Sequence, residues 1–180
     1  MRFYLLGIVL ILSFSSWTSS TELHSTKSYS SVIYQDANGW NLKMSFSSSG
    51  LREGMRSYFK DKELLLGYDE PSKLKIIKYL KEHIDIKVNK QFEANLVGYQ
   101  ATITDHASEI RFKLGNLPTN AFYWDIKINA CKENVHGAEN VMAIKKGSKS
   151  TIIKLTDKNH FQTKVGRDST GEFRKITSRI

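Results

Sequence analysis

The five histidines are the first candidates for metal or acid–base chemistry in this chain of 180 residues. They are His24, His83, His106, His136 and His160. No two of them have metal-ligand spacing, and a zinc site would need three or four ligands converging from separate loops. His106 beside Asp105, and His136 near Glu133 and Glu139, are the best candidates, but both lie in expected turns, where solvated histidines are common. We therefore predict neither a metal nor another cofactor.

Nucleophiles and phosphate-binding loops give equally weak signals. The sequence has no Gly-x-Ser-x-Gly elbow, and its glycines occur singly at turns. The neighbouring carboxylates Asp69 and Glu70 are better explained as a helix cap, because negative charge is favourable at a helix N-terminus. These residue types favour a non-enzymatic module, and the alternative is a small hydrolase or metal-dependent enzyme with a site assembled from loops.

Cys131 is the only cysteine, so no disulfide can form within one chain. It follows a strand-like segment, residues 126–130. A reactive or intermolecular thiol is one interpretation, and a small buried hydrophobic residue is the favoured one.

The positive charge is concentrated near the C-terminus. Of the formal net charge of +9, residues 145–180 hold +7, with ten basic and three acidic side chains. The basic residues are Lys145, Lys146, Lys149, Lys154, Lys158, Lys164, Arg167, Arg174, Lys175 and Arg179. They are the candidate contacts to an anionic envelope surface or glycan, although a run of charge is more often a solvated face. An exported protein partner is the other possibility.

The first twenty residues have the pattern of a secretory signal. Arg2 precedes an apolar run at residues 3–12, and small residues follow, with cleavage expected after Ser20. The run is shorter than the ~20 residues that span a bilayer, which favours cleavage over the alternative, an uncleaved membrane anchor. No later segment is apolar enough to span, so we expect no transmembrane segment after cleavage. We predict an exported protein, periplasmic or extracellular, for which nucleic acid is a poor partner.

The elements that must position these residues are mainly strands. Trp40, Leu42, Met44 and Phe46 alternate with polar residues, which is the period of a half-buried strand. Residues 29–34 and the turn at 38–39 complete a hairpin with them, and residues 122–128 give the clearest strand. Further strands are expected at 84–88, 92–104, 110–114, 140–145 and 150–155, with a bulge at Gly98. This spacing predicts an immunoglobulin-like antiparallel β-sandwich of about eight strands.

One amphipathic helix is inserted between the hairpins. Asp69 and Glu70 supply an acidic cap, Pro71 lies in the first turn, and the helix is expected to run to about His83. Its apolar face is predicted to carry Leu74, Ile77, Leu80 and Ile84. A shorter helical stretch is expected at residues 51–59.

Several short segments, taken in order, resemble an exported bacterial family called domain of unknown function 6702. The segments are Leu65-Leu66-Gly67, Asp69-Glu70-Pro71, Ile77 with Tyr79-Leu80, Ile86-Lys87-Val88-Asn89, Leu96-Val97-Gly98-Tyr99, Val141 with Ile144, and Lys149-Ser150. The resemblance covers residues 29–155 and implies a signal peptide followed by a β-rich domain, with no activity to carry over. The chain departs from the family at residues 110–112, where members carry a Trp-Cys-like pair, and in its long basic tail.

Together these observations divide the chain into three parts. Residues 1–20 are expected to be a signal peptide, residues 21–165 a β-sandwich domain, and residues 166–180 a basic mobile tail. The tail is predicted because residues 168–171 interrupt any strand period. The function expected from the sequence is a binding or envelope-associated module.

Overall fold

The computed structural model describes residues 28–67, 69–132 and 138–176. They form two β-sheets and two α-helices, with one 3₁₀ turn, η1 (Asp157–Asn159). The predicted signal peptide, with its cleavage point, lies outside the described residues. Within the described part of the chain, no helix has the length and apolar character needed to cross a membrane.

The larger sheet, called sheet A, has six strands in the order β5-β6-β2-β1-β8-β9. They are β1 (Ser28–Asp36), β2 (Gly39–Ser47), β5 (Asn95–Ile103), β6 (Ala107–Gly115), β8 (Glu139–Lys146) and β9 (Lys149–Thr156). The predicted hairpins are confirmed: β1 pairs with β2 and β8 pairs with β9. The β1–β2 turn is residues 37–38, because Gly39 already pairs with Asp36. The predicted bulge is confirmed too, because the β5–β6 register shifts around Gly98, whose φ is 58°.

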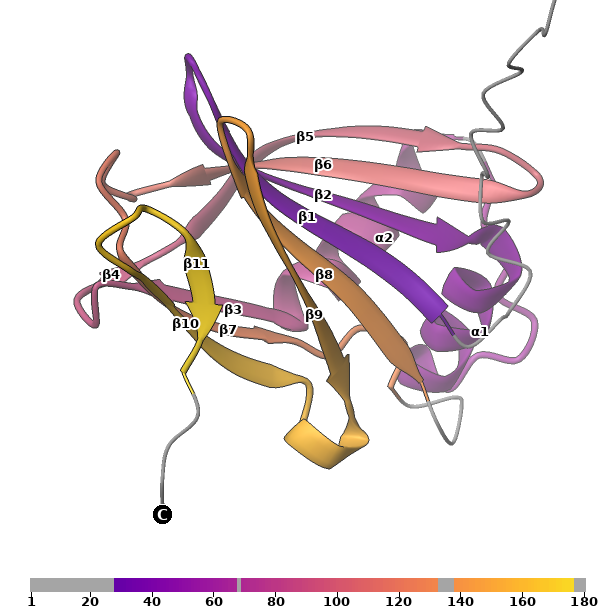
Figure 1. Cartoon of the computed structure of the whole chain (residues 1–180). Helices are drawn as coiled ribbons and strands as arrows, with labels where there is room; N and C mark the ends of the chain where they lie inside the picture. The colour runs from indigo at the N-terminus through magenta and orange to yellow at the C-terminus, as the bar shows by residue number, and fades with distance from the viewer. Residues whose placement is uncertain (1–27, 68, 133–137, 177–180) are drawn as a thin grey trace, which may run out of the picture.

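The smaller sheet, called sheet B, has five strands in the order β11-β10-β7-β3-β4. They are β3 (Ile84–Val88), β4 (Phe92–Glu93), β7 (Tyr123–Ile128), β10 (Gln162–Arg167) and β11 (Phe173–Lys175). The predicted strand at residues 122–128 begins one residue later than expected, and Phe122 is 54% exposed. Figure 1 shows sheet B beside the long diagonal strands of sheet A.

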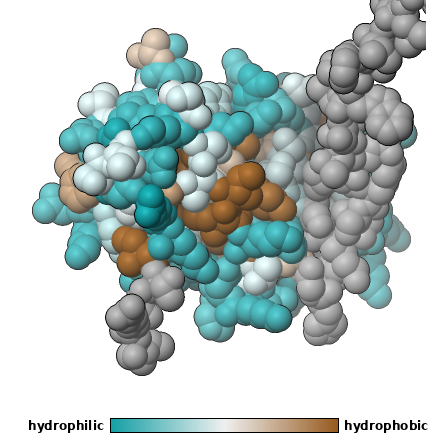
Figure 2. Space-filling model, viewed as in Figure 1, coloured by the Kyte–Doolittle hydropathy of each residue, from teal (hydrophilic) through white to brown (hydrophobic). Residues whose placement is uncertain are grey.

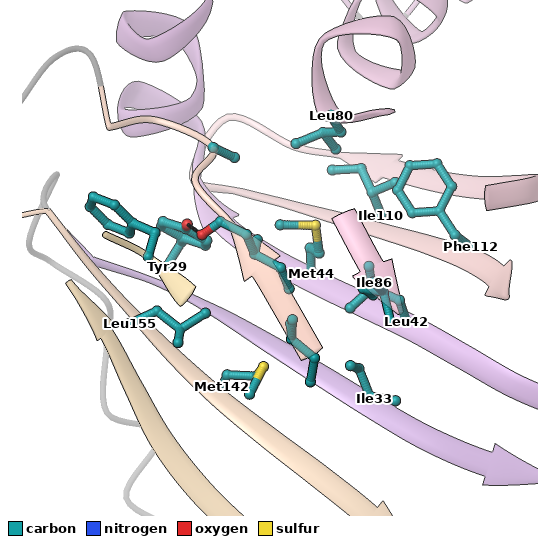
Figure 3. Close-up of a cluster of buried hydrophobic side chains, with 14 of the residues drawn as sticks. Tyr29, Ile33, Leu42, Met44, Leu80, Ile86, Ile110, Phe112, Met142 and Leu155 are labelled. Carbon is teal, nitrogen blue, oxygen red and sulfur yellow. Dashed lines mark hydrogen bonds between the residues drawn. The ribbon is translucent and has the colours of Figure 1, made fainter. Parts of the chain in front are cut away.

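The two sheets share one hydrophobic core. Trp40 of β2 and Trp124 of β7 meet edge to face with ring centroids 4.7 Å apart. The Tyr29 hydroxyl of β1 donates to the Ile128 carbonyl of β7 at 2.9 Å, which ties the sheets together by a hydrogen bond. Figure 3 shows side chains from β1, β2, β3, β6, β8, β9 and α2 gathered in this core. The chain is therefore mainly β, with its strands in two layers.

Two helices complete the cover of the core. In α1 (Ser48–Phe59), the Ser47 side chain accepts from the Gly50 amide, and Leu51 and Met55 are buried. In α2 (Glu70–Glu82), Asp69 is the N-cap and Pro71 lies in the first turn, as predicted. Helix α1 contacts β2 and β6, while α2 contacts β3 and β5.

The predicted apolar face of α2 is wrong at one end. Leu74 is 56% exposed, whereas Ile76 and Tyr79 are fully buried. The prediction and the structure both place Ile77 and Leu80 inside, so the buried face is rotated by part of a turn. Ile84, predicted on the same face, begins β3 instead. Tertiary contact fixes the rotation at Tyr79, whose hydroxyl accepts from the Cys131 amide and whose ring meets the Tyr58 ring of α1.

The strand count and pairing differ from the sequence prediction. The described residues contain eleven strands instead of about eight. Strand β1 pairs with β8 in parallel, so the sheet is not wholly antiparallel. This pairing joins Tyr29 to Asn140. Parallel neighbours are not connected by a tight turn, so no local sequence pattern predicts a contact so distant along the chain.

The strand period also continues past residue 165, contrary to the prediction. Gly166 and Arg167 belong to β10, where Gly166 pairs with Tyr123 of β7. Phe173 begins β11 and is 2% exposed. The boundary drawn between 165 and 166 therefore falls inside a strand, and residues 166–176 contribute to sheet B.

Candidate functional site

The ten predicted cationic contacts do not form one surface. Three are in ion pairs on different strands. These pairs are Lys154–Glu139 at 2.9 Å, Lys164–Asp125 at 4.0 Å and Arg174–Asp168 at 2.9 Å. Lys158 lies in η1, Lys175 ends β11, and Arg179 lies outside the described residues. A carboxylate beside a lysine or arginine cancels much of its field, so the paired three are poor contacts for an anion.

Three of the remaining cations converge at one end of the sandwich. Lys146 ends β8, Lys149 begins β9 directly opposite it, and Arg167 ends β10. The Lys149 ammonium donates to the carbonyl of Thr170, in the loop that follows Arg167. Among the described residues, no carboxylate forms an ion pair with any of the three. We call Lys146, Lys149 and Arg167 the basic corner.

Lys146 is the most constrained member of the basic corner. Its Nζ donates to the Thr119 carbonyl at 3.1 Å and lies 5.6 Å from the centroid of the Trp40 ring. Burial, and then the charge of Arg167, holds the pKa of Lys146 below its ordinary value. Two like charges are thus held near each other, and no carboxylate forms an ion pair with either among the described residues. An anion placed between them would relieve the repulsion.

A hollow of about 360 Å³ opens beside the basic corner. It is lined by Phe122 and by residues 167–171. The Asp168 carboxylate organises this loop, since its Oδ1 accepts from the Thr170 amide and hydroxyl and from the Glu172 amide. The Thr170 hydroxyl and these amide hydrogen bonds, together with Arg174, hold the pKa of Asp168 below its ordinary value. The loop wall is therefore built by its own hydrogen bonds.

Gly171 is needed where this loop turns back to Arg167. Its φ is +81°, and a Cβ there would lie 3.0 Å from Nη2 of Arg167. The Arg167 Nε donates to the Gly171 carbonyl at 3.3 Å. The Gly171 carbonyl thus positions the Arg167 guanidinium at the rim of the hollow. No carboxylate forms an ion pair with this guanidinium among the described residues.

The residues proposed for a loop-built enzyme site are not brought together where the structure describes them. His106 and Asp105 lie in the exposed turn between β5 and β6, and Glu139 begins β8 and pairs with Lys154. Strands β2 and β1 lie between β6 and β8, which separates them by about 14 Å at the usual strand spacing. His136 and Glu133, like His24, lie outside the described residues. Within the described ranges, no group of three His, Cys, Asp or Glu side chains could hold a metal ion.

Two further sequence interpretations are resolved at the packing level. Cys131 is 7% exposed, and its amide donates to the Tyr79 hydroxyl at 2.6 Å, as expected of a buried residue. The Asp69 carboxylate accepts from the Ser72 amide at 2.7 Å, so the Asp69–Glu70 pair is a helix cap as predicted. The Ser72 amide and hydroxyl are the main groups that hold the pKa of Asp69 below its ordinary value.

Sequence reasoning missed the partners that give the basic corner its shape. Thr119 lies in an irregular segment with no charge or periodicity to mark it, and Phe122, expected at the start of a strand, lies just before β7. The cluster Lys145-Lys146-Gly147-Ser148-Lys149 was the available signal, because a tight hairpin must place its flanking lysines together. Arg167 is distant from this cluster in the sequence and reaches it only in the folded chain, where β10 pairs with β7.

The fold and the site define a two-sheet β-protein with an uncompensated basic corner. Comparison with known proteins adds no family to this description: no protein-family model matches the chain, and no curated protein matches it.

Proposed function

We propose that the chain is a non-enzymatic binding module whose basic corner takes an anionic group of the cell envelope. Export to the periplasm or the outside of the cell is part of this proposal, and it rests on the signal-like pattern of residues 1–20. Membership of the exported family called domain of unknown function 6702, which the sequence resembles, is a further proposal and is compatible with a binding module. The immunoglobulin-like character of the sandwich also stays a proposal, supported by two sheets that share a core and not by the parallel β1–β8 pair.

The single observation that carries this function is the set of contacts around Lys146. Its ammonium is held by Thr119 and Trp40, with Arg167 close enough to lower its pKa and no carboxylate in an ion pair with either. Two neighbouring like charges repel each other and so lower stability. A bound anion would offset this repulsion, and charged groups with perturbed pKa values often mark functional sites. The neighbouring hollow, with exposed Phe122 at its edge, could hold the rest of the molecule to which the anionic group belongs.

The proposal is tested by neutralising the basic corner and measuring binding to vesicles. We expect Lys146→Gln/Lys149→Gln/Arg167→Gln to weaken sedimentation with phosphatidylglycerol vesicles by at least about tenfold at low salt, since each cation near an anionic surface contributes about 1 kcal/mol. The wild-type affinity should fall as salt rises, because the Debye length shrinks to about 10 Å at 0.1 M.

The matched control removes the same charge from another surface. Lys75, Lys78 and Lys81 are exposed on α2, so Lys75→Gln/Lys78→Gln/Lys81→Gln changes the net charge equally while leaving the basic corner intact. We expect the control to change affinity by less than about threefold, through the long-range field alone. Equal losses in both triple variants would show that net charge and not the corner governs binding. Wild-type protein that ignores anionic vesicles at low salt would contradict the proposed function.

A further inference from the structure

A second concave surface crosses the outer face of sheet A. This sheet-face groove has a volume of about 420 Å³. Its lining residues are Val32, Tyr34, Gln35, Lys43, Arg111, Lys145 and Gly147. They come from β1, β2, β6 and β8 and from the β8–β9 turn, so the groove runs across the strands. Its size lies within the range of pockets that hold small ligands or a few units of a polymer.

Both sides of the groove carry positive charge. On one side, Lys43 of β2 is paired with Arg111 of β6 in the strand register. On the other side, Lys145 of β8 is paired with Tyr34 of β1, so their side chains share a face. No carboxylate forms an ion pair with Lys145 among the described residues, which leaves its ammonium available to a ligand.

Glu109 forms ion pairs with both Lys43 and Arg111. It lies 3.2 Å from Lys43 Nζ and 2.6 Å from Arg111 Nη2. Burial acts to raise the pKa of Glu109, but hydrogen bonds from Arg111 and Lys43 outweigh it and hold that pKa below its ordinary value. Glu109 is therefore ionised at neutral pH, where it positions the two cations and leaves them one net positive charge.

The floor of the groove is apolar and aromatic. Val32 and Tyr34 are half-buried on the outward face of β1. The register continues from Val32 to Ala143 of β8 and then to Ile152 of β9, which is 70% exposed. Figure 2 shows a hydrophobic patch over β8 and β9, with hydrophilic side chains around it. An occupant must therefore combine apolar contact with negative charge.

We propose that the sheet-face groove binds an acidic sugar chain, with a sugar ring against Tyr34 and its carboxylates between Lys145 and the Lys43–Arg111 pair. This inference rests on the proposed binding function and names the ligand class and the place. A sugar ring has an apolar C–H face that packs on an aromatic ring, and its carboxylate accepts charge-assisted hydrogen bonds from lysine or arginine. Tyr34 on the floor supplies the aromatic ring, and Lys145, Lys43 and Arg111 on the two sides supply the cations.

Two other anionic partners fit the groove less well. A peptide bound as an added strand needs an open sheet edge, but β1, β2 and β8 are interior strands with a neighbour on each side. A membrane surface is broad and flat, whereas these cations flank a recess whose floor holds Tyr34. Apart from Gly147, the groove is lined by residues with side chains, which are the groups that a sugar chain contacts.

The first test measures binding of defined probes by isothermal titration calorimetry. We expect tetragalacturonate to bind the full mature chain, while the neutral sugar maltotetraose binds at least about tenfold more weakly because it lacks the charge-assisted contacts. Hexaglutamate supplies negative charge without a sugar ring and should also bind more weakly. Hexaglutamate binding as tightly as tetragalacturonate would overturn the assignment to sugars.

The aromatic contact is tested at Tyr34. Tyr34→Ala should weaken tetragalacturonate binding by about tenfold, because the stacking platform is lost. Tyr34→Phe keeps the ring and should retain binding within about threefold, which also shows that the sheet face is still folded. Similar affinities for Tyr34→Ala and the wild type would contradict the proposed position of the sugar ring.

The charges are tested by removing them and by removing Glu109. Lys43→Gln/Arg111→Gln should abolish most of the binding, whereas the matched control Lys87→Gln/Lys127→Gln removes two exposed cations from sheet B and should change little. Glu109→Gln should tighten binding, because it frees both cations for the ligand. Weaker binding by Glu109→Gln would show that the ion pairs are structural and would overturn the ligand position.

The same variants separate this inference from the proposed function. The basic-corner triple variant should lose vesicle binding and keep tetragalacturonate binding within about threefold, since Lys145 of the groove and Lys146 of the corner are successive residues of β8 whose side chains point to opposite faces. Vesicle binding at the corner without any tetragalacturonate binding would overturn the groove inference alone. Tetragalacturonate binding that depends on Tyr34, without vesicle binding, would overturn the role of the corner alone.

Discussion

Trp40 and Trp124 join the two sheets at the level of single residues. They are 1% and 0% exposed, so the sequence-based prediction that both are buried is confirmed. The Trp40 indole donates to the Pro118 carbonyl at 3.0 Å, whereas the buried Trp124 Nε1 has no hydrogen-bond partner among the described residues. Trp124 therefore stabilises the fold by packing. Burial of its N–H without a hydrogen-bond acceptor costs part of that stabilisation.

We expect Trp124→Ala to lower the free energy of unfolding by about 3–5 kcal/mol, the usual range for removal of a large buried aromatic side chain. Trp124→Phe should cost less than half as much, because it leaves a smaller cavity and removes no hydrogen bond. Urea unfolding followed by circular dichroism measures both. A loss below about 1 kcal/mol for Trp124→Ala would contradict the role of this ring in the core.

At the same scale, Lys146 combines contact with the core and a charge at the basic corner. Its Nζ lies 5.6 Å from the centroid of the Trp40 ring, and burial, followed by the charge of Arg167, lowers its pKa. A lysine is well suited to this position because its long apolar stem can be buried while its charge stays near solvent.

At the scale of elements, β10 and β11 decide where the domain ends. Val165 is fully buried, Phe173 is 2% exposed, and the Thr151 hydroxyl of β9 donates to the Phe173 carbonyl. These contacts place β11 against sheet A as well as sheet B. The C-terminal region as far as residue 176 is thus part of the packed domain, and its basic residues are displayed by strands.

Truncation after Val165 should therefore destabilise the protein, instead of leaving its melting temperature unchanged as the sequence alone suggested. Phe173→Ala should lower stability by about 3 kcal/mol, equivalent to a fall of roughly 6–12 °C in melting temperature for a chain of this size. Lys175→Ala, at an exposed position on the same strand, is the control and should change stability by less than about 0.5 kcal/mol. An unchanged melting temperature after truncation would show that β11 contributes nothing to stability.

At the scale of the whole molecule, the parallel pair β1–β8 joins two hairpins into one sheet. The β1–β2 hairpin and the β8–β9 hairpin lie far apart in the sequence, and their pairing makes β1 an interior strand. The same pairing aligns Tyr34 with Lys145, and so it builds one side of the sheet-face groove. It also brings the tip of β8–β9 beside Trp40, which helps to form the basic corner.

This arrangement predicts an order of amide hydrogen exchange. The amides of β1 should exchange slowest, because both neighbours must separate before they open, and their protection should approach the global free energy of unfolding. The two-residue strand β4, at the edge of sheet B, should exchange much faster. Exchange followed by NMR measures this order directly. Fast exchange in β1 would contradict its interior position between β2 and β8.

Sequence patterns by themselves determined the elements that depend on local interactions. Alternation of side chains predicted β2 and most of β7, turn residues predicted the two hairpins, and Asp69 with Pro71 predicted the start of α2. Each of these signals lies within a few residues of the structure that it specifies, because strand period, turn geometry and helix capping are short-range effects.

Only the tertiary structure decided which strands lie side by side and which face of α2 is buried. The β1–β8 pair and the β7–β10 pair connect segments with long intervening chain, so their free energy comes from packing and sheet hydrogen bonds that no local pattern encodes. The candidate sites followed the same rule: the sequence identified Lys146, Lys149 and Arg167 as part of a diffuse charge. The fold selected these three because strand pairing brings them to one corner. The carboxylates of the described residues form their ion pairs with other cations, as Asp168 does with Arg174.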